Sequence, residues 1–353
     1  MPQVTMAQLA RELDLSKNAV SLALRHDPQI PAVTRDRVQE AARRRGYTLN
    51  PVVSQLMSEL RRSGERRRSH ALGLINAYRV RDAFRRHPTI PAYVEGCRRR
   101  ANFHGYGLDP FWLHDPDLDG ARLNRILQAR GIRGIIVVGT MDDPHLPERF
   151  RETWQAHACV VTGVRTHDPT LSFCCVDHHA LVLEAMENVR RLGYSRPALV
   201  IDGAIDRLVE GRFSAGMGIG QQAFPPSRRT TPFYDVERAR TEPGLFHRWL
   251  RREKPDVIFT LYNVVRRWVE SCGLNVPENI GLVQLERRPD NADWAGMDQH
   301  NDLTGEAAVD MVIGLLHNHE IGVPLHPRAT LVEASWVPGS TARERIHLTV
   351  KKR

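Results

Sequence analysis

The chain has 353 residues, of which 41% are hydrophobic and 26% are charged, so it is long enough for two or three domains with ordinary cores. There is no apolar run long enough for a membrane-spanning helix and no secretory signal, and we expect a cytoplasmic protein without a membrane partner. Five cysteines without a Cys-x-x-Cys pair are poor material for disulfides and fit a reducing compartment.

The net charge of +9 is unevenly distributed along the chain. Residues 1–70 hold 13 Lys and Arg against 7 Asp and Glu, so this fifth of the chain carries +6 and the remainder only +3. A basic N-terminal segment ahead of a nearly balanced body predicts a polyanion as the partner of that segment.

The basic segment has the pattern of three short helices. Thr5 stands in an N-cap position before apolar residues at helical spacing, and Ser16 does the same for a second stripe. We expect Thr34 to cap a third helix that ends at Gly46. Two helices of about eight residues, joined by a tight turn and braced by a third, form a helix-turn-helix unit.

The second helix is the predicted reading element. Its outward side chains are expected to be Ser16, Lys17, Asn18, Ser21 and Leu22. Lysine can donate to guanine and asparagine can bond adenine in the major groove, while a helix N-terminus with a serine can hold phosphate. The alternative is a three-helix packing unit without a ligand.

Four motifs in fixed order extend this interpretation. Residues 4–10, 15–21, 34–38 and 46–51 together resemble the LacI (lac-repressor-type) family of transcription regulators, and the match covers residues 4–60. Leu22 stands where many members carry a base-reading arginine, which implies a different half-site at that step.

Residues 50–60 predict a short hinge helix, followed by a basic linker up to residue 69. Such a helix is too short to be stable alone in water. The resemblance implies that two hinge helices pair in the minor groove, where Leu56 wedges a base step. It also places Thr5 and Asn50 among the DNA contacts. A plain linker helix is the alternative.

From residue 70 buried strands alternate with helices, which predicts two doubly wound parallel sheets. The fold class is therefore α/β with an N-terminal all-α helix-turn-helix domain, and the body resembles the two-lobed periplasmic-binding-protein-like body of the same family. The expected boundaries are 1–48 for the head, 49–70 for the hinge, 71–340 for the body and 341–353 for a tail. The lobes are placed at about 71–160 and 175–295, with crossings near 161–174 and after 295.

The resemblance also implies an effector site in the cleft between the lobes. The positions carried over are Tyr78, Arg165, Asp177, Arg212, Asn263 and Glu286. Asn263 replaces an acid that binds sugar hydroxyls, and an amide both donates and accepts where a carboxylate only accepts. A saccharide or sugar derivative is the expected effector, and the alternatives are a non-sugar metabolite or a cleft that senses nothing.

Other chemistries are not expected. The histidine pairs 178–179 and 317–319 lack the spacing and third ligand of a zinc site, and no nucleotide-binding or nucleophile motif is present. We therefore expect no enzyme, no metal and no cofactor. The prediction is a DNA-binding regulator, acting as a repressor, that binds a palindromic operator as a homodimer or tetramer and responds to a small molecule.

Overall fold

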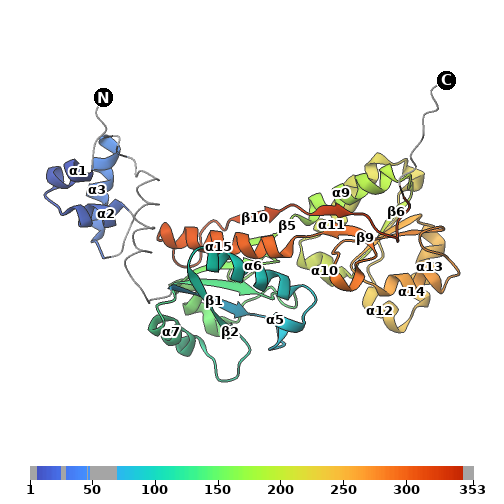
Figure 1. Cartoon of the computed structure of the whole chain (residues 1–353), viewed down its shortest axis with the longest axis horizontal. Helices are drawn as coiled ribbons and strands as arrows, with labels where there is room; N and C mark the ends of the chain where they lie inside the picture. The colour runs from blue at the N-terminus through green and yellow to red at the C-terminus, as the bar shows by residue number, and fades with distance from the viewer. Residues whose placement is uncertain (1–5, 25–28, 46, 48–69, 345–353) are drawn as a thin grey trace.

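A computed structural model of the chain describes residues 6–24, 29–45, 47 and 70–344. The N-terminal part consists of α1 (Met6–Leu13), α2 (Lys17–Leu24) and α3 (Ala32–Arg44), shown in blue in Figure 1. Their apolar stripes meet in one small core, in which Leu9, Val20 and Val38 are fully buried. This core holds the three helices in the predicted helix-turn-helix arrangement.

The third helix begins earlier than expected. Pro31 rather than Thr34 is its N-cap residue, and the Pro31 carbonyl accepts the first helical hydrogen bond, from the Arg35 amide at 3.0 Å. A proline fits this position because it supplies the carbonyl while its own missing N–H is not needed. Gly46 and the expected hinge and linker residues 48–69 lie outside the described residues.

Lobe one is built on a six-stranded, wholly parallel sheet in the order β10-β5-β4-β3-β1-β2. Its strands are β1 (His70–Asn76), β2 (Tyr106–Trp112), β3 (Gly134–Val138), β4 (Ala158–Thr162), β5 (Ser172–Val176) and β10 (Ala329–Val332). The short helix α5 (Ala83–Arg86) follows β1. One face is covered by α6 (Ile90–Phe103) and α15 (Asn301–His317), the other by α7 (Gly120–Ala129) and α8 (Arg151–Ala156). The edge strand β2 contains Pro110, and prolines in sheets are confined to such edges.

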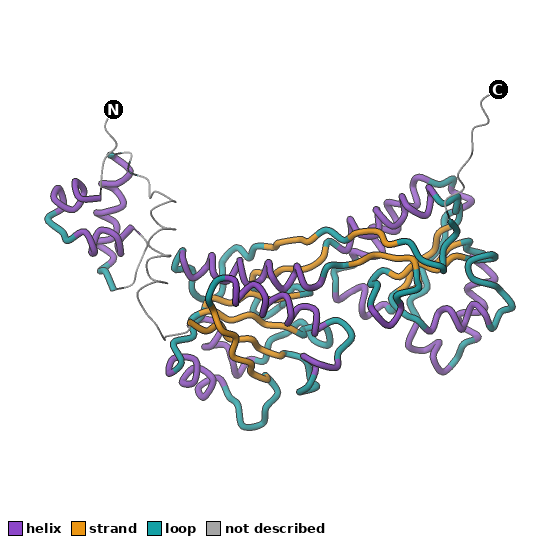
Figure 2. Tube along the Cα trace, in the orientation of Figure 1, coloured by secondary structure: helices purple, strands orange, loops and turns teal. Residues whose placement is uncertain are grey.

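Lobe two is built on a five-stranded sheet in the order β11-β9-β8-β7-β6. Its strands are β6 (Pro197–Val200), β7 (Val257–Thr260), β8 (Gly281–Gln284), β9 (Ala295–Asp298) and β11 (Ser335–Val337), of which only β11 is antiparallel to its neighbour. One face packs on α9 (His178–Arg191) and α11 (Arg212–Gly220), with α10 (Gly203–Leu208) beside them. The other face packs on α12 (Val236–Thr241), α13 (Gly244–Glu253) and α14 (Val264–Glu270). Figure 2 shows both sheets enclosed between helices.

The chain passes between the lobes three times. The first passage follows β5 at Asp177, the second lies between β9 and α15, and the third joins β10 to β11. The expected crossing near 161–174 falls too early, because β5 pairs with β4 and so belongs to lobe one. The third passage was not predicted, since the exposed strand β10 has no alternating or continuous apolar pattern.

The predicted fold class is confirmed by these two doubly wound sheets behind a helix-turn-helix unit. The body extends beyond the expected boundary at residue 340. Thr341 is fully buried in lobe two, where its hydroxyl donates to the Leu282 carbonyl at 2.7 Å and accepts from the Ala295 amide at 3.0 Å. Residues 345–353 of the expected tail lie outside the described residues.

Candidate DNA-binding and effector sites

The start of α2 is held by a side-chain cap. The Ser16 hydroxyl accepts a hydrogen bond from the Ala19 amide at 3.0 Å, and this satisfies one of the amides that a helix leaves unpaired at its first turn. The hydroxyl proton of Ser16 is still available to donate to a phosphate oxygen. Ser16 thus has the capping role that its position in the sequence predicted.

The predicted DNA contacts differ in exposure. Ser16 and Lys17 are exposed, whereas Ser21 and Leu22 are partly buried. Asn18 lies on α2, but its side chain is outside what the structure describes, as are Thr5, Asn50 and Leu56 altogether. The described helices therefore place an exposed lysine and a capped helix N-terminus at one end of α2.

Two of the predicted effector residues are arginines that share one carboxylate. The Arg165 guanidinium lies 3.3 Å from one Glu210 oxygen, and the Arg212 guanidinium donates to the other at 3.1 Å. Arg165 also covers the Phe173 ring at 5.3 Å from its centroid. We call Arg165, Glu210 and Arg212 the arginine cluster. The space between its side chains amounts to only about 10 Å³, too little for a ligand.

Glu210 was not among the predicted residues. It lies in a tight turn between α10 and α11, where its φ of +59° is in the left-handed region. Asp177, which was predicted, caps α9: its side chain accepts a hydrogen bond from the Ala180 amide at 3.1 Å. The carboxylate of Asp177 is therefore engaged in holding a helix.

The amide of Asn263 is engaged inside lobe two. Its oxygen accepts from the Gln284 and Asn291 side-chain amides at 2.7 and 3.3 Å, and its nitrogen donates to Asp290 at 3.2 Å. Both halves of the amide are needed for this network, since a carboxylate cannot donate. The replacement of the expected acid by asparagine thus has a structural reason.

Glu286 joins the two lobes. It follows β8 in lobe two, yet it accepts hydrogen bonds from the Thr89 hydroxyl of lobe one and from the Asn301 amide at 3.1 Å. Arg288 lies 3.4 Å away on its other side. Burial raises the pKa of Glu286, and these partners oppose that rise only in part.

Tyr78 lies near the same contact on the lobe one side. Its ring meets the His87 ring edge to face at 4.8 Å between centroids, and its hydroxyl donates to Asp142. Burial and then the Asp142 charge raise the pKa of Tyr78, while burial lowers the pKa of His87. The His87 Nδ1 accepts from the Thr89 amide at 3.1 Å, so Tyr78, His87, Thr89 and Glu286 form one inter-lobe chain of contacts.

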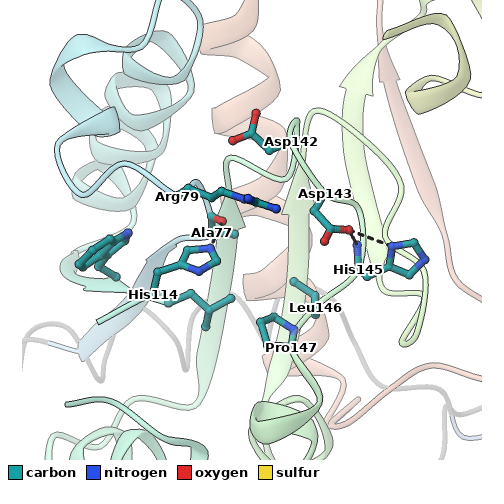
Figure 3. A pocket seen from close by; sticks show the side chains of 10 residues that line it. Ala77, Arg79, His114, Asp142, Asp143, His145, Leu146 and Pro147 are labelled. Carbon is teal, nitrogen blue, oxygen red and sulfur yellow. Dashed lines mark hydrogen bonds and ion pairs between the residues drawn. The ribbon is translucent and has the colours of Figure 1, made fainter. Parts of the chain in front are cut away.

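A pocket of about 500 Å³ lies at the carboxyl ends of β1, β2 and β3. We call it the switch-point pocket, and its lining consists of Ala77, Arg79, Trp112, Leu113, His114, Asp142, Asp143, His145, Leu146 and Pro147. Figure 3 shows the Arg79 guanidinium extending into this space, with Asp142 and Asp143 on loops beside it. None of the six predicted effector residues lines this pocket.

The polar groups of the switch-point pocket are held in place by local bonds. The ring of His114 donates from Nε2 to the Ala77 carbonyl at 2.9 Å. Asp143 accepts from the amide and from Nδ1 of His145, both at 2.9 Å, and these bonds lower the pKa of Asp143. The sequence signal that points to this site is the presence of Trp, His and Asp at or shortly after the ends of strands that meet at one sheet edge.

The described residues meet the requirements of neither a metal site nor a membrane-spanning helix. Among the described residues, no group of three or more His, Cys, Asp and Glu side chains has the arrangement of a metal site. Nor does any helix within those same ranges have the length and apolar character needed to cross a membrane.

Comparison with known proteins identifies the fold. The structure superimposes on a transcriptional regulator CelR–cellobiose complex with a TM-score of 0.58 at 16% identity, over 96% of this chain and 100% of that one. It superimposes on a lac repressor dimer bound to operator and the anti-inducer ONPF with a TM-score of 0.55 at 17% identity, over 97% and 100%. The chain has the fold of the LacI-type transcription regulators. A LacI-type protein of Rhizobium etli gives a TM-score of 0.60 at 13% identity, over 78% and 100%.

The sequence comparisons are weaker than the structural ones. A curated HTH-type transcriptional regulator of Mycolicibacterium smegmatis is 28% identical over 194 residues, which is 54% of this chain. The chain spans about half the length of that relative, 50%. No family model matches the chain. The LacI-type fold therefore rests on the arrangement of the elements more than on retained residues.

Proposed function

We infer that the chain is a LacI-type transcription regulator that binds a palindromic operator as a homodimer and responds to a small-molecule effector in its body. One observation carries this conclusion: a helix-turn-helix unit with an exposed Lys17 and a capped α2 N-terminus precedes a two-lobed body of LacI-type fold. Anionic DNA is the partner that suits a helix N-terminus on a basic segment. A structural neighbour supports this proposal, since the lac repressor dimer of similar fold is bound to operator DNA.

Dimerisation follows from the size of the reading element. The eight residues of α2 reach only a few base pairs, whereas two copies related by a two-fold axis read a palindrome in successive grooves. Repression is the expected outcome of such binding. In this proposal Leu56 wedges a base step in the minor groove and Asn50 contacts DNA.

The effector acts by changing the relation of the lobes. Glu286 and Thr89 form a contact between the lobes, and a ligand that binds one lobe arrangement better shifts the population toward that arrangement. A coupling of about 1–3 kcal/mol changes operator affinity by roughly five- to 150-fold. The CelR structure contains cellobiose, which supports a sugar or sugar derivative as the effector class.

One observation favours an alternative in which the six predicted residues bind no effector. Arg165 and Arg212 are both ion-paired to Glu210, and both halves of the Asn263 amide are hydrogen-bonded within the protein. A regulator that senses a ligand elsewhere, or a non-sugar metabolite, agrees with this pattern.

The test is selection of duplexes from a random oligonucleotide pool by the full chain at fixed salt. Enrichment of a palindrome with two half-sites is expected, and enrichment of no sequence over the input pool contradicts the proposal.

Lys17→Ala is expected to relax the base preference at one half-site position, at a cost of about 1–3 kcal/mol. Arg43→Ala, which removes an exposed arginine from α3, is the matched control and should leave the preferred sequence unchanged. A uniform loss for all duplexes with Lys17→Ala would assign Lys17 to phosphate instead.

A further inference from the structure

We propose that the switch-point pocket is a carbohydrate subsite that takes one sugar ring against Trp112. The inference rests on the proposed function, because it assigns the effector class and its location in a LacI-type regulator. It differs from the cleft site implied by resemblance, since no residue of that predicted set lines this pocket.

The position of the pocket follows from the strand order. In the order β10-β5-β4-β3-β1-β2, the chain leaves β1 toward β2 on one side, and then returns to β3 on the other side of β1. The loops after β1 and β3 therefore diverge at the carboxyl edge and leave a crevice between them, which is where open α/β sheets bind ligands. The volume of about 500 Å³ falls within the usual range for ligand pockets.

Trp112 supplies a rigid apolar surface. Its indole N–H donates to the Tyr78 carbonyl at 3.0 Å, and the Arg81 guanidinium lies 5.7 Å from its ring centroid. Two contacts thus fix the ring at the pocket wall, so little side-chain entropy remains to be lost on binding. A flat aromatic ring is suited to the apolar C–H face of a sugar ring.

The charges in the pocket favour a neutral polyhydroxylated ligand over an anion. Arg79 brings one positive charge, whereas Asp142 and Asp143 bring two negative charges. A carboxylate accepts bonds from two neighbouring hydroxyls, and a guanidinium donates to hydroxyl or ring oxygens. A phosphate or carboxylate ligand would meet two like charges at close range.

Asp143 is oriented for such a role. Both hydrogen bonds described for it, from the His145 amide and ring, use Oδ1, so Oδ2 lies on the other side of the carboxylate. The lowered pKa of Asp143 keeps this group ionised and therefore a pure acceptor. Figure 3 shows both His145 contacts as dashed lines.

The pocket is connected to the contact between the lobes. Asp142 lines the pocket and also accepts from the Tyr78 hydroxyl, and its charge acts on His87. His87 in turn holds the Thr89 amide, and the Thr89 hydroxyl binds Glu286 of lobe two. A sugar whose hydroxyls donate to the Asp142 carboxylate therefore perturbs the chain of contacts that joins the lobes.

The experiment is calorimetric titration of the full chain with glucose, maltose, cellobiose and lactose, and with inorganic phosphate and citrate as anionic probes. At least one sugar is expected to bind. Trp112→Ala and Asp142→Asn should weaken that sugar by at least about tenfold, or 1.4 kcal/mol. Trp112→Phe keeps a flat ring and should retain most of the affinity, and Arg85→Ala on α5 is the matched control.

Four results would overturn the proposal. These are no binding of any sugar, binding of an anionic probe alone, sugar binding unaffected by Trp112→Ala and Asp142→Asn, and equal loss with Arg85→Ala. Thermal unfolding of each variant identifies any variant that fails to fold. If Trp112→Ala does not fold, the sugar affinities of Trp112→Phe and Asp142→Asn decide: the proposal requires most of the affinity to remain in the first and to be lost in the second. Duplex selection by the same protein reports separately on the proposed regulator, so a failed sugar titration with a selected palindrome rejects the subsite alone.

Discussion

The arginine cluster and the switch-point pocket contain similar charged side chains, but these are packed against one another in the cluster and face open volume in the pocket. In the cluster, Glu210 lies against the guanidinium groups of both Arg165 and Arg212, and almost no space is left. In the pocket, Arg79 and Asp143 lie beside a cavity of about 500 Å³. Charged residues at a position that binds ligands in other proteins indicate a site only where open volume and polar groups facing it remain.

The largest effect is expected from filling the switch-point pocket. Ala77→Phe places a ring in the space proposed for the sugar, so binding should weaken by more than about tenfold in calorimetric titration. Ala121→Phe adds the same ring at an exposed position on α7 and should change nothing. Undiminished sugar binding by Ala77→Phe would show that the open volume of the switch-point pocket is not where the sugar binds.

A second test restores the acid that resemblance led us to expect in the cleft. Asn263→Asp puts a carboxylate 3.2 Å from Asp290 and deletes a donor, which should cost about 1–2 kcal/mol of stability at neutral pH. Repulsion raises the pKa of the new carboxyl, so this cost should shrink as the pH falls toward 4 in thermal unfolding. Improved sugar affinity in this variant would instead show that Asn263 belongs to the effector site.

The arginine cluster itself is tested with Glu210→Gln. The two guanidinium groups then face each other without a carboxylate, and the loss is expected to be at most about 1 kcal/mol because all three side chains are partly exposed. Inorganic phosphate should raise the melting temperature of this variant and leave the wild type unchanged. An unaltered melting temperature with and without phosphate would mean that the cluster is not held by its charges.

The smallest effect is expected at Glu286, which forms the contact between the lobes. Because burial raises its pKa in the folded state, its contribution to stability is fully present below its ordinary value of 4.5 and is lost as the pH rises through the raised value. Glu286→Gln keeps the shape of the side chain and removes this loss, so the melting temperature of the variant should rise relative to that of the wild type as the pH increases above 4.5. A constant difference above pH 4.5 would contradict the assignment.

Much of the fold was predictable because its signals are local. The apolar spacing of α1 and α2 and the N-cap at Ser16 depend on neighbours within a few residues. Continuous apolar runs such as β3 predict buried parallel strands in the same way. The exposed strand β10 lacks both patterns, because its place in the sheet is fixed by pairing with β5 and not by burial.

The site was less predictable because its partners are distant in sequence. Nothing near Arg165 indicates that Glu210, on a turn after α10, will neutralise it. The switch-point pocket needs the adjacency of β2, β1 and β3, and that strand order is a property of the whole sheet. Residue types therefore predicted the kinds of chemistry, while tertiary contacts decided which groups are still available for a ligand.

The three passages of the chain between the lobes restrict how the body can move. Two rigid bodies joined by a single strand can swivel freely, but parallel links at Asp177, between β9 and α15, and between β10 and β11 resist torsion. Bending about the line of these links is the motion that stretches none of them. A ligand bound on one side of that line would therefore open or close the lobes, and this is the motion that the helix-turn-helix end of the protein would experience.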